Sequence, residues 1–140
     1  MSRIFWDTNL FIYLFEDYGS LSQQVTRLRR SMLERGDQLL TSTLTLGEIM
    51  VKPYEQSQDE LARKYQQAIT AVAQVLPFDT TAAGVYARLR CDRSIRAPDA
   101  IQLACASAAG ADLFITNDSH LHKKHVDGIQ FITSLDRAPL

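Results

Sequence analysis

Four acidic residues occupy places where a carboxylate needs a partner for its charge. Two of them directly follow short apolar runs, and the other two lie in or at the start of apolar, helix-like segments. These residues are Asp7, Glu48, Asp99 and Asp118. Carboxylates seldom occupy such places unless something stabilises their charge. If the four converge, the simplest common partner is a hard divalent cation, and oxygen-only ligands favour Mg²⁺ or Mn²⁺ over zinc.

A metal held by clustered carboxylates suits the hydrolysis of phosphodiester bonds. The metal lowers the pKa of a water molecule, neutralises charge in the transition state, and a second metal can stabilise the leaving oxygen. Polar residues adjoin two of the acids, namely Thr8, Asn9, Thr116 and Asn117. Their side chains are suited to orienting carboxylates or water molecules around a metal.

Each acid also has a simpler explanation. Asp7 could cap a following helix, Asp99 could favour the positive end of a helix macrodipole, and Asp118 could occupy a turn or a cap. Glu48 could face solvent from a short amphipathic helix. Four clustered carboxylates without a metal would repel one another and raise at least one pKa, however, and such an arrangement tends to mark function.

Short apolar runs alternate along the chain with longer helical patterns. We predict strands over residues 4–6, 38–41, 74–78, 113–116 and 129–132, and helices over residues 10–16, 21–34, 43–51 (ended by Pro53), 60–75, 80–93 and 98–109. This alternation predicts an α/β fold with a mostly parallel, five-stranded sheet and helices on both faces. Ligands of such sheets bind beyond the carboxyl ends of the strands, where Asp7 and Asp118 should lie.

The composition indicates one domain that spans residues 1–140. The chain is 46% hydrophobic and has a formal net charge of -1, so no basic tail is visible, although a local basic face remains possible. Cys91 and Cys105 form no close-spaced pair, which is typical of the reducing cytoplasm. No segment approaches the roughly 18 apolar residues of a membrane span. We therefore expect a cytoplasmic protein without a membrane segment.

Basic residues offer further candidates for binding. Arg88, Arg93 and Arg96 precede Asp99 and could contact substrate phosphates, whereas the ordinary alternative is a solvated helix face. His120 and its neighbours His122 and His125 suggest zinc, but no cysteine or tetrahedral ligand spacing accompanies them. We expect these histidines to lie on the surface, where they could contact phosphate or a partner.

The acidic motifs resemble those of the PIN-domain ribonucleases, and most of all the VapC-type toxins of bacterial and archaeal toxin–antitoxin systems. The resemblance rests on Asp7-Thr8-Asn9, on Glu48 within Thr45-Leu46-Gly47-Glu48-Ile49, on Asp99-Ala100-Ile101-Gln102-Leu103-Ala104 and on Thr116-Asn117-Asp118. It extends from residue 4 to about residue 131. Any one of these motifs is weak, but four in order on a matching α/β pattern form a fairly strong signal.

The resemblance implies a sheet whose central strand ends at Asp7 and whose neighbouring strand ends at Asp118. It implies that Asp7, Glu48, Asp99 and Asp118 are the catalytic and metal-binding residues, with Mg²⁺ or Mn²⁺ as cofactor. The implied activity is endonucleolytic cleavage of RNA by metal-activated water. The implied partners are a second copy of the chain and a small, VapB-like antitoxin whose tail enters the active-site groove. In that sheet order Asp79 follows an edge strand, so we interpret it as a helix cap.

Two other functions are compatible with parts of the sequence. A non-catalytic PIN-like module could hold RNA or a protein without cutting, which the near-neutral charge and the separate arginine clusters would suit. A phosphotransfer protein could use Asp7 as a nucleophile, but such sites normally place their further acids or a lysine at strand ends. Glu48 and Asp99 are predicted on helices instead. A metal-dependent endoribonuclease accounts for all four acids.

Overall fold

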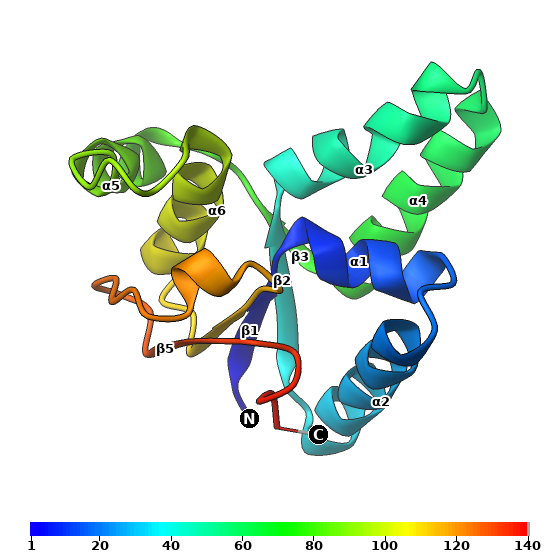
Figure 1. The fold of residues 1–140 in the computed structure, drawn as a ribbon, viewed down its shortest axis with the longest axis horizontal. Helices are drawn as coiled ribbons and strands as arrows, with labels where there is room; N and C mark the ends of the chain where they lie inside the picture. Colours follow the sequence, from blue (N-terminus) through cyan, green and yellow to red (C-terminus); the bar gives the residue numbers. More distant parts are fainter. Residues whose placement is uncertain (140) are drawn as a thin grey trace.

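Five parallel strands form a sheet in the order β3-β2-β1-β4-β5 (Figure 1). The computed structural model describes residues 1–139. The strands are β1 (Arg3–Trp6), β2 (Gln38–Ser42), β3 (Gln74–Leu76), β4 (Leu113–Ile115) and β5 (Phe131–Thr133). The predicted α/β class is confirmed, as are the central position of β1 and its pairing with β4. Strand β3 lies at an edge, also as expected.

Helices cover both faces of the sheet, as the alternating pattern predicts. They are α1 (Thr8–Phe15), α2 (Ser20–Arg35), α3 (Thr43–Glu55), α4 (Asp59–Val72), α5 (Thr80–Leu89) and α6 (Ala97–Ala108), with a short 3-10 helix η1 (Ser119–Leu121) after β4. Helices α3 and α4 pack together and project from one end of the sheet (Figure 1). No helix within residues 1–139 combines the length and the apolar character that crossing a membrane requires.

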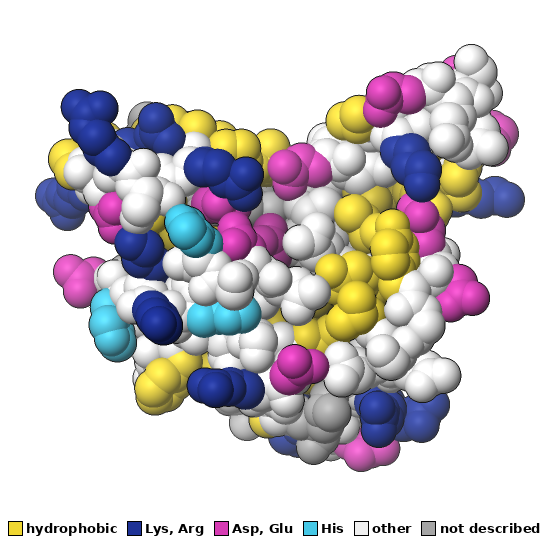
Figure 2. Space-filling model, viewed as in Figure 1, with side chains coloured by type: hydrophobic (Ala, Val, Ile, Leu, Met, Phe, Trp, Pro, Cys, Tyr) yellow, Lys and Arg dark blue, Asp and Glu magenta, His cyan; other side chains and the backbone are white. Residues whose placement is uncertain are grey.

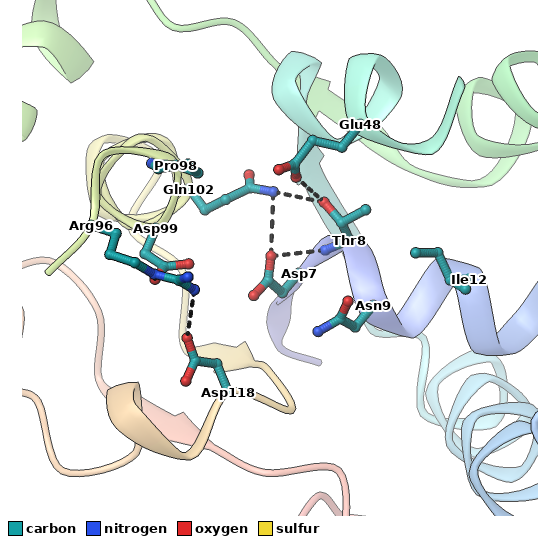
Figure 3. Close-up of a pocket in the computed structure, with 10 residues that line it drawn as sticks. All are labelled: Asp7, Thr8, Asn9, Ile12, Glu48, Arg96, Pro98, Asp99, Gln102 and Asp118. Carbon is teal, nitrogen blue, oxygen red and sulfur yellow. Dashed lines mark hydrogen bonds and ion pairs between the residues drawn. The ribbon is translucent and has the colours of Figure 1, made fainter. Parts of the chain in front are cut away.

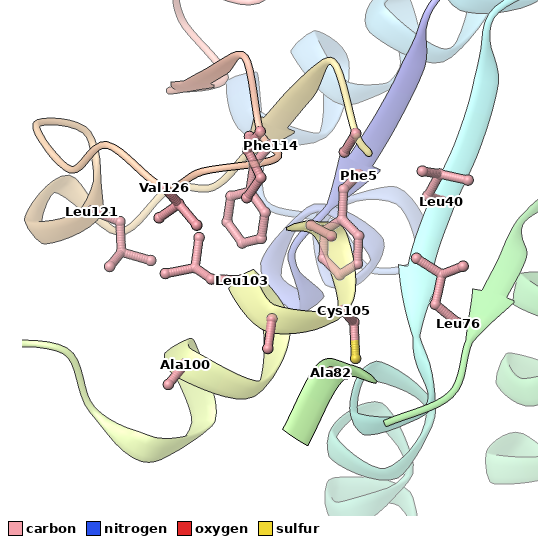
Figure 4. Close-up of a cluster of buried hydrophobic side chains, with 14 of the residues drawn as sticks. Phe5, Leu40, Leu76, Ala82, Ala100, Leu103, Cys105, Phe114, Leu121 and Val126 are labelled. Atoms are coloured by element: carbon pink, nitrogen blue, oxygen red, sulfur yellow. The ribbon is translucent and has the colours of Figure 1, made fainter. Parts of the chain in front are cut away.

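Alternating side chains of the strands divide the interior into two cores. Phe5 of β1 stacks on Phe114 of β4 at a ring distance of 5.0 Å and faces α5 and α6 (Figure 4). Its neighbours Ile4 and Trp6 point the other way, into the core formed with α1, α2 and α4. Successive side chains of a strand point to opposite faces, so each sheet face buries its own apolar set. Trp6 is fully buried there.

Several element ends differ from the prediction for local reasons. Helix α3 does not stop before Pro53 but continues to Glu55, and the Gln56 N–H bonds to the Lys52 carbonyl to close its last turn. Proline removes only its own N–H, so a helix can continue past it when that end is otherwise bonded. Helix α5 ends at Leu89 instead of Arg93, because Asp92 accepts hydrogen bonds from the N–H and the hydroxyl of Ser94 and forms a turn.

Candidate active site

The four predicted acids line one pocket at the carboxyl edge of the sheet (Figure 3). The cavity has a volume of about 570 Å³. Its lining consists of Asp7, Thr8, Asn9, Ile12, Glu48, Arg96, Pro98, Asp99, Gln102 and Asp118. Asp7 follows β1 and Asp118 follows β4, whereas Glu48 lies on α3 and Asp99 in the first turn of α6. The sheet order thus brings together residues that are far apart in the sequence.

Asp7 is the most enclosed of the four, with 8% of its surface exposed. It caps α1, because its Oδ1 accepts a hydrogen bond of 2.8 Å from the Thr8 N–H. Its Oδ2 accepts a 2.7 Å bond from the Thr116 hydroxyl. Burial raises the pKa of Asp7, and the charges of Glu48 and Asp118 add to the rise, against these hydrogen bonds, which lower it. The simple explanation as a helix cap is therefore correct but incomplete.

Glu48 is tied to the end of β1 through a hydroxyl. The Thr8 Oγ1 donates a 2.6 Å hydrogen bond to the Glu48 Oε1 and lies 3.2 Å from the hydroxyl of Thr45. Thr45 in turn accepts a 2.9 Å bond from Thr41 of β2. Glu48 is exposed, as a solvent-facing helix position would be, yet its carboxylate points into the pocket (Figure 3). Thr8, named above as a candidate for orienting carboxylates, thus donates to one of the four acids.

Gln102 connects this network to α6, a role that the sequence prediction missed. Its side chain is buried, and its Nε2 lies 2.8 Å from the Thr45 hydroxyl, 3.1 Å from the Thr8 hydroxyl and 3.4 Å from the Asp7 Oδ1. Its Oε1 accepts a hydrogen bond from Ser42, the cap residue of α3. The signal available in the sequence was a lone amide within the apolar segment of α6. A buried amide needs several partners, and here those partners hold the acids.

Asp99 and Asp118 share a cation supplied by the chain itself. The Arg96 Nε lies 3.4 Å from the Asp99 Oδ2, and its Nη2 lies 3.6 Å from the Asp118 Oδ2. Burial raises the pKa of Asp99, and the charges of Asp118 and Asp7 raise it further, while Arg96 opposes the rise. Asp118 also caps η1 through a 3.0 Å bond from the His120 N–H. Its expected role as a cap and its place in the pocket therefore coexist.

The other predicted residues divide between the pocket and its surroundings. Thr116 bonds to Asp7, and Asn9 lines the pocket, but Asn117 lies outside it and donates a 3.0 Å hydrogen bond to the Tyr13 hydroxyl. Of the three candidate arginines, only Arg96 lines the acidic pocket. Arg88 lines a separate pocket beside His125, and Arg93 is exposed in the turn after α5. Spacing along the sequence could not distinguish these three, because the turn at residues 90–94 redirects the chain.

The acidic pocket offers the type of ligand atom that a hard cation prefers, but its carboxylates are not arranged to coordinate one. The donors are carboxylate oxygens, burial and then the neighbouring negative charges raise the pKa values of Asp7 and Asp99, and Arg96 already acts as a counter-ion. Among the residues that the structure describes, no group of three or more His, Cys, Asp or Glu side chains is placed to hold a metal ion as it stands. Like charges repel, so such carboxylates spread apart and pair with the cation at hand. The Arg96 side chain is 77% exposed, and ion pairs with an exposed partner are worth only about 0–1 kcal/mol, so releasing Arg96 costs little.

An acid-lined pocket at the carboxyl edge of a five-stranded parallel sheet defines the class: an α/β protein with carboxylates gathered beyond the ends of its central strands. Residues 4–126 match the PIN domain. The chain therefore belongs to the PIN domain family. No curated protein matches the sequence.

Solved structures with the same fold come from toxin–antitoxin complexes. VapBC2 from Rickettsia felis, bound to a promoter DNA fragment, has a TM-score of 0.74 at 14% identity and covers 94% of this chain and 98% of that chain. DNA-bound VapBC from Salmonella typhimurium has a TM-score of 0.74 at 19% identity, with coverages of 96% and 99%. VapBC-1 from nontypeable Haemophilus influenzae gives 0.72 at 17%, with coverages of 96% and 99%. At these identities the likeness establishes the fold.

Proposed function

We propose that this protein is a metal-dependent endoribonuclease that hydrolyses phosphodiester bonds of RNA, and that it is the toxin of a VapBC-type pair. The observation that carries the proposal is the convergence of four carboxylates in one pocket of a PIN domain. Such a pocket lowers the stability of the folded protein when these acids are ionised, because burial and mutual repulsion raise the pKa values of Asp7 and Asp99. Perturbed acids gathered in a cleft are typical of a functional site.

Each side chain has a definite part in this proposal. Asp7, Glu48, Asp99 and Asp118 would hold Mg²⁺ or Mn²⁺, and Thr8, Thr116 and Gln102 would keep the first two acids in place through their hydrogen bonds. When bound, the ion would acidify a water molecule and neutralise charge on the phosphate in the transition state. Arg96, once released from the acids, would be free to contact a substrate phosphate.

The proposal is tested with purified protein and RNA. Cleavage should require Mg²⁺ or Mn²⁺ and should stop with EDTA, and Asp7→Asn or Asp99→Asn should abolish it by removing a ligand charge. Asp59→Asn is the matched control, because Asp59 is an exposed acid at the start of α4 outside the pocket. Cleavage that survives in both pocket variants, or that proceeds undiminished in EDTA, would overturn the proposal.

One observation favours a second candidate, the non-catalytic PIN-like module. Arg96 bridges Asp99 and Asp118 and could act as their permanent counter-ion without any metal. In that case RNA or a protein would bind without being cut, and calorimetric titration with Mn²⁺ would show no binding. Measurable Mn²⁺ binding that disappears in Asp99→Asn would exclude this alternative.

The proposed partners are a VapB-like antitoxin and a second copy of the chain. Beside the acidic pocket lies a broad hydrophobic surface (Figure 2). The similar structures are complexes with antitoxins, so we propose that an antitoxin tail covers this surface and enters the pocket. Co-expression with the product of a short adjacent reading frame should give a stable complex and suppress RNA cleavage.

Sedimentation equilibrium of the protein alone would test the proposed homodimer.

A further inference from the structure

A second cavity lies next to the acidic pocket, and its chemistry is the opposite. We call it the β5 pocket, and its volume is about 520 Å³. Cations and hydroxyl groups dominate its lining, among them Ser119, His122, Lys123, Thr133, Ser134 and Arg137. In Figure 2 the acidic side chains at the centre of the face are bordered on the left by His, Lys and Arg side chains. The two pockets thus form a negative and a positive part of one surface.

The β5 pocket occupies the same edge of the sheet as the acids, one strand further along. Ile115 of β4 pairs with Thr133 of β5, and the Thr116 N–H bonds to the Thr133 carbonyl at 3.1 Å. Neighbouring strands lie about 4.8 Å apart, so the carboxyl end of β5 follows directly after that of β4. Asn117 lines the β5 pocket and Asp118 lines the acidic pocket, so adjacent residues of one loop form the boundary between them.

The cations of the β5 pocket are available to bind an anion. Neither Lys123 nor Arg137 takes part in an ion pair within residues 1–139, whereas Arg96 and Lys124 nearby both do. The acid among the lining residues is Asp136, whose Oδ1 accepts a 3.3 Å hydrogen bond from Gln24. Hydroxyl groups and unpaired cations together are the side-chain types that contact nucleic-acid phosphates.

His122 lines the β5 pocket and also supports the acidic pocket through a hydrogen bond. The His122 Nε2 lies 2.8 Å from the Thr116 carbonyl oxygen and donates to it, while the Thr116 hydroxyl donates to Asp7. At the other wall, the Arg137 N–H bonds to the carbonyl oxygen of Ser134 at 3.2 Å. The wall of the β5 pocket is therefore fixed relative to the acid at which the reaction is proposed to occur.

We propose that the β5 pocket binds a backbone phosphate of the RNA strand adjacent to the phosphate that is cut. The inference rests on the proposed RNA substrate and adds a direction to it: the strand crosses from the acidic pocket over the loop 116–119 to the end of β5. A strand on this path places its scissile phosphate near the carboxylates and a neighbouring phosphate near Lys123 and Arg137. The carboxylates of the acidic pocket repel RNA and outnumber its single cation, Arg96, so the β5 pocket supplies further attraction for the strand.

Binding of RNA, measured apart from cleavage, tests this inference. Fluorescence anisotropy with a labelled, mixed-sequence single-stranded RNA in EDTA gives the Kd as a function of salt. The double variant Lys123→Gln with Arg137→Gln should weaken binding about tenfold and lower the slope of log Kd against log salt by about 0.7, since a single strand contributes roughly 0.7 per phosphate contact and the pocket is proposed to hold one phosphate. Lys64→Gln with Arg30→Gln is the matched control, because it removes two exposed charges from α4 and α2.

The possible outcomes separate clearly. Loss of binding in the β5-pocket variant alone, with an unchanged circular dichroism spectrum, supports the inference. Unchanged binding overturns it, and so does an equal loss in the control, which would mean that only net charge matters. Failure of the proposed function looks different: a wild-type protein that binds RNA through Lys123 and Arg137 but never cuts it would refute the nuclease and leave the phosphate site standing.

Discussion

Asp7 serves the fold and the proposed chemistry with the same carboxylate. One oxygen caps α1, the other accepts the Thr116 hydroxyl, and both lie in a buried place that disfavours charge. Hydrogen bonds offset part of the burial cost, but the pKa of Asp7 is still raised. A carboxylate kept ionised here is therefore a source of instability that a cation would relieve.

The raised pKa of Asp7 predicts how stability depends on pH. A group whose pKa is higher in the folded state favours folding while protonated, and that contribution is lost as pH rises through the folded pKa. Asp7→Asn keeps a carbonyl oxygen to cap α1 and removes the charge. At neutral pH in EDTA we expect its free energy of unfolding to exceed that of the wild type by about 1 kcal/mol, a gain typical when a strained site is relaxed, and its Tm to be correspondingly higher.

Thermal melts followed by circular dichroism would check the sign. The advantage of Asp7→Asn should shrink on acidification and vanish below about pH 4, where the reference carboxylate is itself protonated. Asp59→Asn, at an exposed position, should show no such gain. A wild type that is more stable than Asp7→Asn at neutral pH without metal would contradict the assigned cause.

Most elements of the fold could be predicted because their signals were local, and the places of β1, β4 and β3 in the sheet came with the family resemblance. Apolar runs of strand length, Gly36 after α2 and Pro98 in the first turn of α6 each reflect a backbone preference. Helix α3 was predicted too short because the stabilisation of its last turn past Pro53 depends on bonds formed beyond it. Element ends that depend on such contacts cannot be derived from propensity.

The acids that line the pocket could be predicted, as could Thr8 and Thr116 beside them, but Gln102 could not. Carboxylates beside apolar runs are conspicuous, whereas Gln102 matters only because α6 packs against the ends of β1 and β2 and the start of α3. The different positions of Arg88 and Arg96 relative to the acids likewise depend on a turn between them. Helix packing, more than residue type, decides which polar groups support the pocket.

Gln102 joins α6 to three other elements, so its removal should loosen the pocket. In Gln102→Met a side chain of similar size loses the hydrogen bonds to Ser42, Thr8 and Thr45. We expect destabilisation of about 1–3 kcal/mol from unsatisfied partners and a 10- to 100-fold loss of Mn²⁺ affinity by calorimetry, the usual effect of removing groups that orient metal ligands.

Asp79→Ala is the control for Gln102→Met, because it should lower the stability of the protein by a similar amount at a site outside the acidic pocket. Asp79 caps α5 by accepting a 2.9 Å hydrogen bond from the Ala82 N–H, and it follows the edge strand β3, as the sequence predicted. Losing this cap should cost about 1 kcal/mol and leave Mn²⁺ affinity unchanged. If both variants weakened Mn²⁺ binding in proportion to their loss of stability, Gln102 would have only a structural role.

Across the whole molecule, the surface separates three kinds of chemistry on one face. The acidic pocket lies between a hydrophobic surface near α1, α3 and α4 and the cationic β5 pocket (Figure 2). A net charge of only -1 conceals this separation, so the formal charge of the chain says little about what it binds. The parallel sheet produces the arrangement, since it brings the loops after β1, β4 and β5 to a common edge.

Metal binding should therefore raise the unfolding temperature of the entire domain. A ligand that binds only the folded state stabilises it by roughly 2.7 kcal/mol at 100 times its Kd, which for a chain of this size raises Tm by roughly 5–10 °C. We expect Mn²⁺ to raise the Tm of the wild type by this amount and to leave Asp7→Asn and Asp99→Asn almost unchanged. The wild type, less stable than Asp7→Asn in EDTA, should become the more stable of the two with Mn²⁺. An equal rise in all three proteins would indicate binding elsewhere on the surface, and no rise in the wild type would mean that the four acids hold no metal.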